Sequence, residues 1–74
     1  MVYRRIRDLR EDSDLAQRQM AEVLGCSQQA YSGYELGQRM IPPEILVALA
    51  RFHHTSVDYL LGLTNEKRPY PRAK

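Results

Sequence analysis

The 74-residue chain, with a formal net charge of +2, is long enough for one domain and too short for the elaborate active-site cavity of a large enzyme. Its single cysteine, Cys26, excludes an internal disulfide, and this favours a reducing compartment, the cytoplasm. No apolar run approaches the roughly 20 residues that span a bilayer, and the charged N-terminal segment lacks a signal-peptide core, so we expect neither a membrane span nor a targeting segment.

The first predicted helix runs from about Val2 to Asp12 and turns Ile6 and Leu9 toward the core. Positive charge gathers on this helix and near the C-terminus, at Arg4, Arg5, Arg7, Arg10, Lys67, Arg68, Arg72 and Lys74. Between residues 13 and 37 only one residue, an arginine at position 18, is positive, and acidic residues outnumber it. This middle segment therefore carries a net negative charge.

Two short helices are predicted on either side of Gly25, from apolar residues at helical spacing. They cover residues 16–24 and 28–36. Gly25 tolerates the left-handed backbone of a sharp corner, and Ser27 can cap the helix that follows. Ala16, at the start of the helix over residues 16–24, lacks a capping oxygen, and this typically costs about 1 kcal/mol of helix stability. This end of the helix therefore frays, or Asp14 caps it instead. Two helices joined in this way are typical of a helix-turn-helix DNA-binding motif.

Two further helices are predicted in the C-terminal half of the chain. Gly37 closes the helix before them, in the C′ position that favours a left-handed residue. The Pro42–Pro43 pair suits the first turn of a fourth helix, which ends near His53. Ser56 caps a fifth helix, which Gly62 closes.

The segment after residue 63 has several prolines and basic residues and little apolar content. This composition is typical of a mobile or extended tail. We therefore expect a helix-turn-helix domain over residues 1–63 and a flexible, basic, proline-containing tail over residues 64–74, with no internal repeat.

Many residues between about Ile6 and Gly62 fall in register with one known family. They are Gln17, Ala21, Leu24, Gly25, Ser27, Ser32, Glu35, Gly37, Pro42, Leu46, Ala50, Ser56, Asp58, Leu60 and Leu61. In these positions the chain resembles the phage-repressor and Cro-like (Xre-type) helix-turn-helix family. The resemblance implies an all-α, compact five-helix bundle of the lambda-repressor-like DNA-binding type, with the helix-turn-helix in helices two and three. It also implies that the third helix enters the major groove and that dimers bind palindromic operators, usually to repress transcription.

The resemblance places Gln28, Gln29 and Ser32 at the surface that contacts bases. A glutamine amide can donate to adenine N7 and accept from adenine N6 at once. The alternative is that both glutamines are solvated, because glutamine is a good helix former on any exposed face. We favour base contact for the glutamines, whereas Ser32 reaches a base edge or a phosphate. Gly33 stands where the family often has a longer polar or basic side chain, so one groove contact is lost.

Phosphate contacts are expected from Gln17, Arg18, Gln38 and Arg39. In the family, Gln17 touches a phosphate at the start of helix two, and Arg39 matches a basic residue that meets the DNA backbone. Gln38 replaces what is frequently another basic residue. This sparse charge leaves a rival interpretation open, a protein-interaction or antitoxin-like module with weak or no DNA binding.

The resemblance also implies a structural ion pair between Arg10 and Glu35, which would orient the third helix against the first. Val57, Tyr59 and Leu63 add apolar area beyond what the core needs, and we expect them to form a dimer interface that is weak without DNA. Such a homodimer would regulate transcription, more as a repressor than as an activator, because the chain shows no segment for recruiting polymerase.

No catalytic arrangement, metal site or cofactor site is expected from the remaining polar residues. Adjacent side chains on a helix point apart, so His53 and His54 make a poor metal pair, and His54 suits a left-handed backbone instead. Cys26 is expected to act as a small buried apolar residue rather than as a redox switch. Tyr31 and Tyr34 should pack inward, although Tyr34 could present its hydroxyl to a phosphate.

Overall fold

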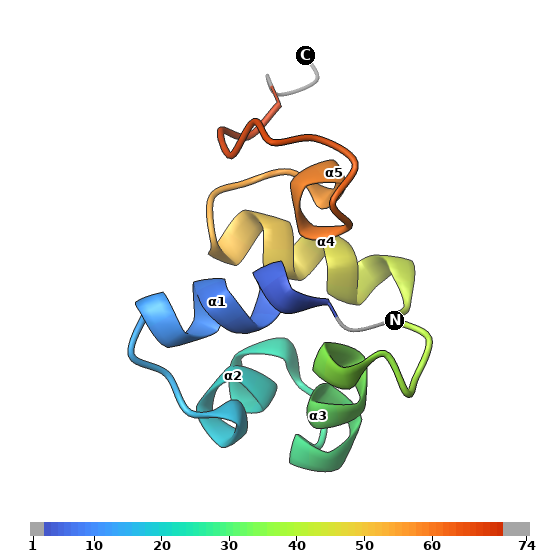
Figure 1. Ribbon diagram of the computed structural model, residues 1–74. Coiled ribbons are helices and arrows are strands. Elements are labelled where there is room, and N and C mark those ends of the chain that lie inside the picture. Colours follow the sequence, from blue (N-terminus) through green and yellow to red (C-terminus); the bar gives the residue numbers. More distant parts are fainter. Residues whose placement is uncertain (1–2, 71–74) are drawn as a thin grey trace.

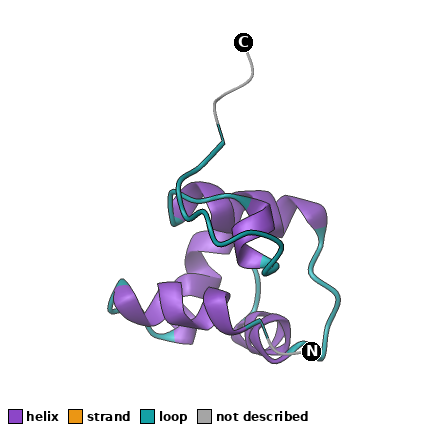
Figure 2. Ribbon diagram, turned by 45° about the horizontal axis from the view of Figure 1, so that its top comes forward, coloured by secondary structure: helices purple, strands orange, loops and turns teal. Residues whose placement is uncertain are grey.

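The computed structural model describes residues 3–70, which form five helices and no strand (Figure 1 and Figure 2). The helices are α1 (Arg4–Asp12), α2 (Gln17–Leu24), α3 (Gln28–Leu36), α4 (Pro43–Phe52) and α5 (Val57–Leu60). The predicted all-α, five-helix architecture is therefore confirmed for this part of the chain. The predictions for Val2, Pro71, Arg72 and Lys74 lie outside the described residues.

The helices are arranged as two pairs with α1 between them. The α2–α3 pair forms one end of the molecule, and α4 packs with α5 at the other end (Figure 1). Helix α1 contacts both α3 and α5, while α2 also contacts α4.

Each helix contributes one large, fully buried side chain to a shared core. The five residues are Ile6, Met20, Tyr31, Leu49 and Leu60. Burying an apolar side chain of this size contributes about 1.5–3 kcal/mol relative to leaving it exposed. Even the four-residue α5 therefore belongs to the core. The predicted inward positions of Leu9 and Tyr34 are also confirmed, since both are buried.

Local sequence signals account for most of the helix ends. Gly25 and Gly37 adopt the left-handed region, with φ values of 71° and 72°, and end α2 and α3. The Ser27 hydroxyl oxygen accepts the Ala30 backbone N–H at 3.0 Å, as an N-cap does. His54 has a φ of 56°, which confirms its predicted left-handed backbone.

Three helix boundaries differ from the sequence prediction. Helix α1 begins at Arg4, after the N-cap residue Tyr3, and α5 is a single turn that ends at Leu60. Asp14 does not cap α2, because it lies in the preceding turn with a φ of 57°. Ala16 is the N-cap residue, and its backbone N–H donates to Gln19 Oε1 at 2.8 Å. A side chain inside the helix thus replaces the cap that alanine cannot supply.

The segment 64–70 contains no helix, but side chains of the bundle hold it in place. Arg5 Nη1 donates to the Thr64 backbone oxygen at 2.5 Å, and Arg5 Nη2 donates to Asn65 Oδ1 at 2.7 Å. The Thr55 hydroxyl donates to the backbone oxygen of Lys67 at 2.5 Å. Residues 64–70 are thus in contact with the bundle rather than detached from it, while the division into a domain and a flexible tail stays a prediction.

Candidate nucleic-acid interface

The turn between α2 and α3 sets the direction in which α3 leaves the bundle. The Cys26 backbone N–H donates to the Ala21 oxygen at 3.0 Å, which closes the end of α2 just past Gly25. The Ser27 cap then starts α3 two residues later. The first residues of α3, Gln28 and Gln29, are exposed. Cys26 itself is half-buried, and burial raises the pKa of its thiol, which favours the unreactive protonated form.

A shallow depression lies on the outer face of the α2–α3 pair. Its lining residues are Gln17, Gln28, Gln29, Ser32, Gly33 and Gln38. The structure therefore brings together the three residues expected to contact bases and two of those expected to contact phosphates. Within residues 3–70, no hydrogen bond engages the side chains of Gln28, Gln29, Ser32 or Gln38. These polar groups are available to a partner.

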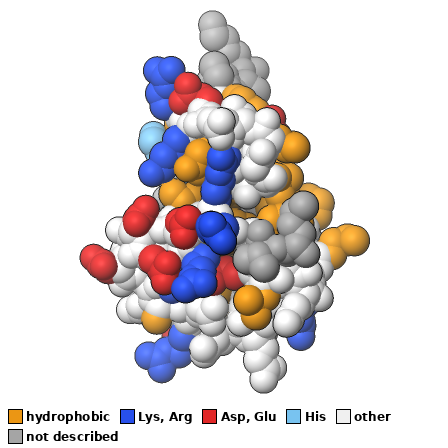
Figure 3. All heavy atoms as spheres, viewed as in Figure 1, with side chains coloured by type: hydrophobic (Ala, Val, Ile, Leu, Met, Phe, Trp, Pro, Cys, Tyr) orange, Lys and Arg blue, Asp and Glu red, His pale blue; other side chains and the backbone are white. Residues whose placement is uncertain are grey.

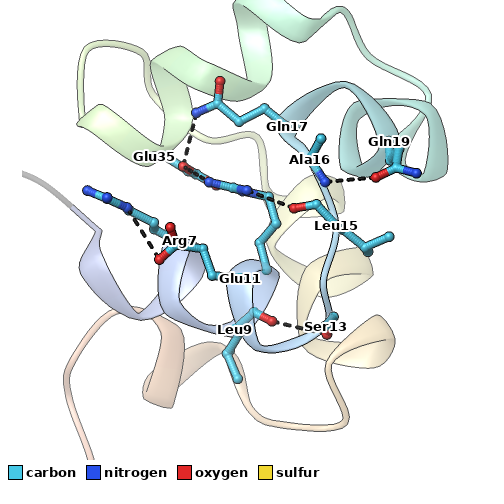
Figure 4. A network of polar contacts seen from close by, with 10 residues as sticks. Arg7, Leu9, Glu11, Ser13, Leu15, Ala16, Gln17, Gln19 and Glu35 are labelled. Atoms are coloured by element: carbon cyan, nitrogen blue, oxygen red, sulfur yellow. Dashed lines mark hydrogen bonds and ion pairs between the residues drawn. The ribbon is translucent and has the colours of Figure 1, made fainter.

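Gln17 differs from its neighbours in the depression because part of its amide is already used. Its Nε2 donates to Glu35 Oε1 at 3.2 Å, so the side chain points inward toward α3 (Figure 4). A primary amide has two N–H donors, and one remains for a phosphate. The sequence did not reveal this contact, because it depends on how α2 packs against α3.

Glu35 lies beneath the depression and forms an ion pair with Arg10 of α1. Arg10 Nε donates to Glu35 Oε2 at 2.7 Å, and Arg10 Nη2 donates to Oε1 at 3.3 Å. The two side chains are only 11% and 3% exposed. Arg10 Nη1 also donates to the Leu15 backbone oxygen at 2.8 Å, so one guanidinium links α1, the α1–α2 loop and α3.

Opposing effects set the ionisation of this buried group. Burial raises the pKa of Glu35, whereas the hydrogen bonds from Arg10 and Gln17 lower it. The lowering is the larger effect, so the pKa of Glu35 lies below its usual range. Burial and the adjacent Glu35 carboxylate raise the pKa of Tyr31. The Tyr31 hydroxyl is buried and makes no hydrogen bond with a described residue. The ionised pair is therefore buried behind α3, next to the Tyr31 ring.

Arg18 and Arg39, the two arginines expected to contact phosphates, are both exposed. Arg39 lies in the loop after α3, and its side chain passes over Gly33 at the edge of the depression. The sequence predicts only a lost contact at Gly33 and does not reveal this packing. The glycine inside a helix was the signal that could have suggested a close approach at this position.

On the face that Figure 3 shows, charged side chains gather over α1 rather than over the α2–α3 end. Figure 3 shows red and blue groups crowded across the middle of this face, whereas its lower end, formed by α2 and α3, is mostly uncharged with isolated blue groups at its edges. The uneven charge expected from the sequence is thus visible on this face.

The residues expected in a dimer interface lie at and after α5, at the end of the molecule away from α3 (Figure 1). Leu63 is 73% exposed, while Val57 and Tyr59 are half-buried. The Arg5 guanidinium lies 4.2 Å from the centre of the Tyr59 ring and also donates to the Tyr59 backbone oxygen at 2.9 Å. Tyr59 is therefore partly covered from within its own chain, which the sequence did not indicate.

The histidines take structural positions in the described part of the chain. The His53 ring meets Phe52 edge-on, with ring centres 5.1 Å apart, and burial together with nearby Lys67 lowers the pKa of His53. In residues 3–70, no three His, Cys, Asp or Glu side chains come together in a way that could hold a metal ion. None of the helices described is long and apolar enough to cross a membrane.

A family model for the helix-turn-helix matches residues 6–60. This range runs from the buried Ile6 of α1 to the buried Leu60 of α5, so it includes the whole of the α2–α3 pair and the core. The chain belongs to the helix-turn-helix family. Membership confirms the Xre/Cro-like resemblance and the lambda-repressor-like fold.

Relatives of this helix-turn-helix chain occur in Bacillus subtilis (strain 168). The chain is 42% identical over 69 residues to the uncharacterized HTH-type transcriptional regulator YobD, a match that covers 93% of the chain and 62% of YobD. It is 35% identical over 69 residues to the HTH-type transcriptional regulator AnsR, covering 93% of the chain and 60% of AnsR. The chain thus spans about three fifths of the length of these relatives. No solved structure matches the chain significantly.

Proposed function

We propose that this chain is the DNA-binding part of a transcriptional regulator and that α3 contacts the bases of double-stranded DNA. The observation that carries the proposal is the glutamine pair at the start of α3. Gln28 and Gln29 are exposed, follow the Ser27 cap and line a depression in which their own side chains have no hydrogen-bond partners among residues 3–70. The relatives named transcriptional regulators support the same function.

The chemistry of the depression suits a duplex. The amides of Gln28 and Gln29 can each donate and accept at adenine in the major groove. Gln17 and Gln38 line the same depression, and Arg18 and Arg39 are exposed. We assign these four residues to phosphate contacts, which position the protein without reading sequence. The Arg10–Glu35 ion pair holds α3 against α1, so the amides are presented by a rigid helix.

We further propose a homodimer that represses transcription in the cytoplasm from a palindromic operator. Two α3 helices read adjacent major-groove faces when a two-fold axis separates them by about one helical turn, roughly 34 Å. Val57, Tyr59 and Leu63 supply the apolar contact, and Leu63 offers the most exposed area of the three. An interface of so few residues buries well under the roughly 1,600 Å² of a standard complex, so dimerisation depends on DNA.

Selection of bound sequences from a random duplex library tests the proposal. Gln28→Ala should then weaken binding to the selected duplex by about 1–3 kcal/mol and relax the preference at one base pair. Val23→Ala, an exposed substitution on α2 outside the depression, serves as the control and should change neither quantity. Unchanged selectivity in the Gln28 variant would contradict its role as a base contact.

A second candidate is a protein-interaction or antitoxin-like module, which the sparse charge near α3 favours. Exposed apolar side chains at the α4–α5 end, including Phe52 at 44% and Leu63 at 73% exposure, would serve such a contact. Failure to enrich any duplex, together with no duplex binding at low salt, would favour this function over DNA recognition. That the chain is not an enzyme stays a prediction.

A further inference from the structure

Gly33 lies in the middle of α3, and the side chain of Arg39 fills the space beside it. A Cβ atom built on Gly33 would lie 2.8 Å from Arg39 Cγ, 2.9 Å from Cδ and 3.3 Å from Nε. Contacts below 3.0 Å are not compatible with a real Cβ. The aliphatic part of Arg39 therefore occupies the position that a side chain at residue 33 would take.

The backbone after α3 brings Arg39 to this position. Gly37 turns the chain with its left-handed φ of 72°, and the backbone N–H groups of Gln38 and Arg39 donate to the Gly33 oxygen at 2.9 and 3.2 Å. The loop is thus tied to the residue over which the Arg39 side chain passes. The Gly33 carbonyl oxygen fixes the backbone of Arg39, and the absence of a side chain at Gly33 leaves room for the Arg39 side chain.

The guanidinium of Arg39 is unengaged at the end of this path. Arg39 is exposed, and within residues 3–70 no hydrogen bond or ion pair holds its side chain. Its stem crosses a residue that lines the depression together with Gln28, Gln29 and Ser32. A guanidinium has five donors in a planar fork, which matches the O6 and N7 acceptors of guanine.

We propose that Arg39, laid across α3 at Gly33, contacts a guanine in the major groove and supplies the base contact that α3 itself lacks at residue 33. This assignment rests on the proposed DNA-binding function and changes the role of Arg39 from a general phosphate contact to a determinant of specificity. Packing against Gly33 restricts the arginine stem before DNA binds, so less side-chain freedom is lost on binding. Gly33 acts as a positioning residue, because it sets where the guanidinium lies.

The test measures dissociation constants on the selected duplex and on every single-base-pair change of it, for the unchanged chain, Arg39→Ala, Arg39→Lys, Gly33→Ala and the double variant Gly33→Ala/Arg39→Ala. Arg39→Ala should lose about 5- to 150-fold on the selected duplex and lose its preference at one G·C pair. Arg39→Lys keeps the charge but not the planar fork, so it should also lose that preference. Gly33→Ala displaces the Arg39 stem while keeping its charge, and it should relax the same base pair.

The double variant should bind no worse than Arg39→Ala, because both changes remove one contact. Thermal unfolding of Gly33→Ala should show a fold at least as stable as that of the unchanged chain, since alanine is the better helix former. Equal weakening on all duplexes by Arg39→Ala, with Arg39→Lys retaining affinity, would overturn this assignment and leave the proposed function standing. Additive losses in the double variant would also overturn it. Absence of duplex binding by the unchanged chain would overturn both.

Discussion

The Arg10 guanidinium donates to both oxygens of Glu35, at 2.7 and 3.3 Å, and so joins α1 to α3. Gln17 adds a third hydrogen bond to the same carboxylate from the start of α2, at 3.2 Å. The Tyr3 backbone N–H also donates to the Glu35 backbone oxygen, at 3.0 Å. One acidic residue thus fixes the orientation of the helix that carries Gln28 and Gln29.

Glu35→Gln should destabilise the chain by about 3–5 kcal/mol, because it leaves the buried Arg10 without a compensating charge. The exposed pair of Arg7 and Glu11, 3.6 Å apart, gives the matched control. Glu11→Gln should cost no more than about 1 kcal/mol, since a solvated pair contributes little. Urea unfolding of both variants measures the difference. Equal losses in the two variants would contradict the role assigned to burial.

Stability should fall as the pH is lowered below about 5, because the folded pKa of Glu35 lies below its ordinary value of about 4.3. For a carboxyl group with a lowered folded pKa, the stabilisation is complete above the unfolded pKa and is lost as the pH falls through the folded pKa. Unfolding measured from pH 7 to pH 2 should therefore show a shallower acid loss in Glu35→Gln than in the unchanged chain. A Glu11→Gln control should keep the full pH dependence, and identical curves for all three would refute the assignment.

The affinity for DNA should depend only moderately on salt. Arg5 and Arg10 are engaged within the bundle, which leaves Arg18 and Arg39 as the arginines near α3 in each subunit. Arg18 would neutralise about two phosphates per dimer, and Arg39 adds two more only if it contacts the DNA backbone rather than guanine. The slope of log affinity against log salt should therefore lie between about −2 and −4. Titration of the selected duplex at several salt concentrations gives the slope. A value near zero would favour the protein-interaction function.

Leu63→Asp should abolish cooperative binding to a palindromic site while leaving the fold intact, because Leu63 is 73% exposed and an aspartate there opposes an apolar contact. Tyr59 is a poorer site for this test, since Arg5 packs over its ring and a substitution also disturbs α1. Gel shifts measure the affinities for the whole site and for a half site, and the ratio of these two affinities gives the cooperativity. Sedimentation gives the oligomeric state of the protein without DNA. Met40→Asp, 93% exposed in the loop after α3, is the control and should lower both affinities while keeping their ratio. Cooperativity that survives Leu63→Asp would exclude this interface.

Local physics made the helices and most of their ends predictable from the sequence by itself. Glycines 25 and 37 end helices because they adopt the left-handed backbone, and Ser27 and Ser56 start them because their hydroxyl oxygens accept a nearby N–H. The core side of α1 was predictable because helical spacing places Ile6 and Leu9 on one face. The exposed glutamine pair at the start of α3 followed from the position of the cap.

Only the tertiary structure decided which side chains meet across the bundle. The Gln17 amide turned toward Glu35, Arg5 packed on Tyr59 and Arg39 crossed Gly33 through contacts between separate elements. Long polar side chains have many rotamers of similar energy in isolation, and the surrounding elements select among them. Sequence patterns therefore determine where such residues are placed along a helix, whereas packing determines the groups that they contact.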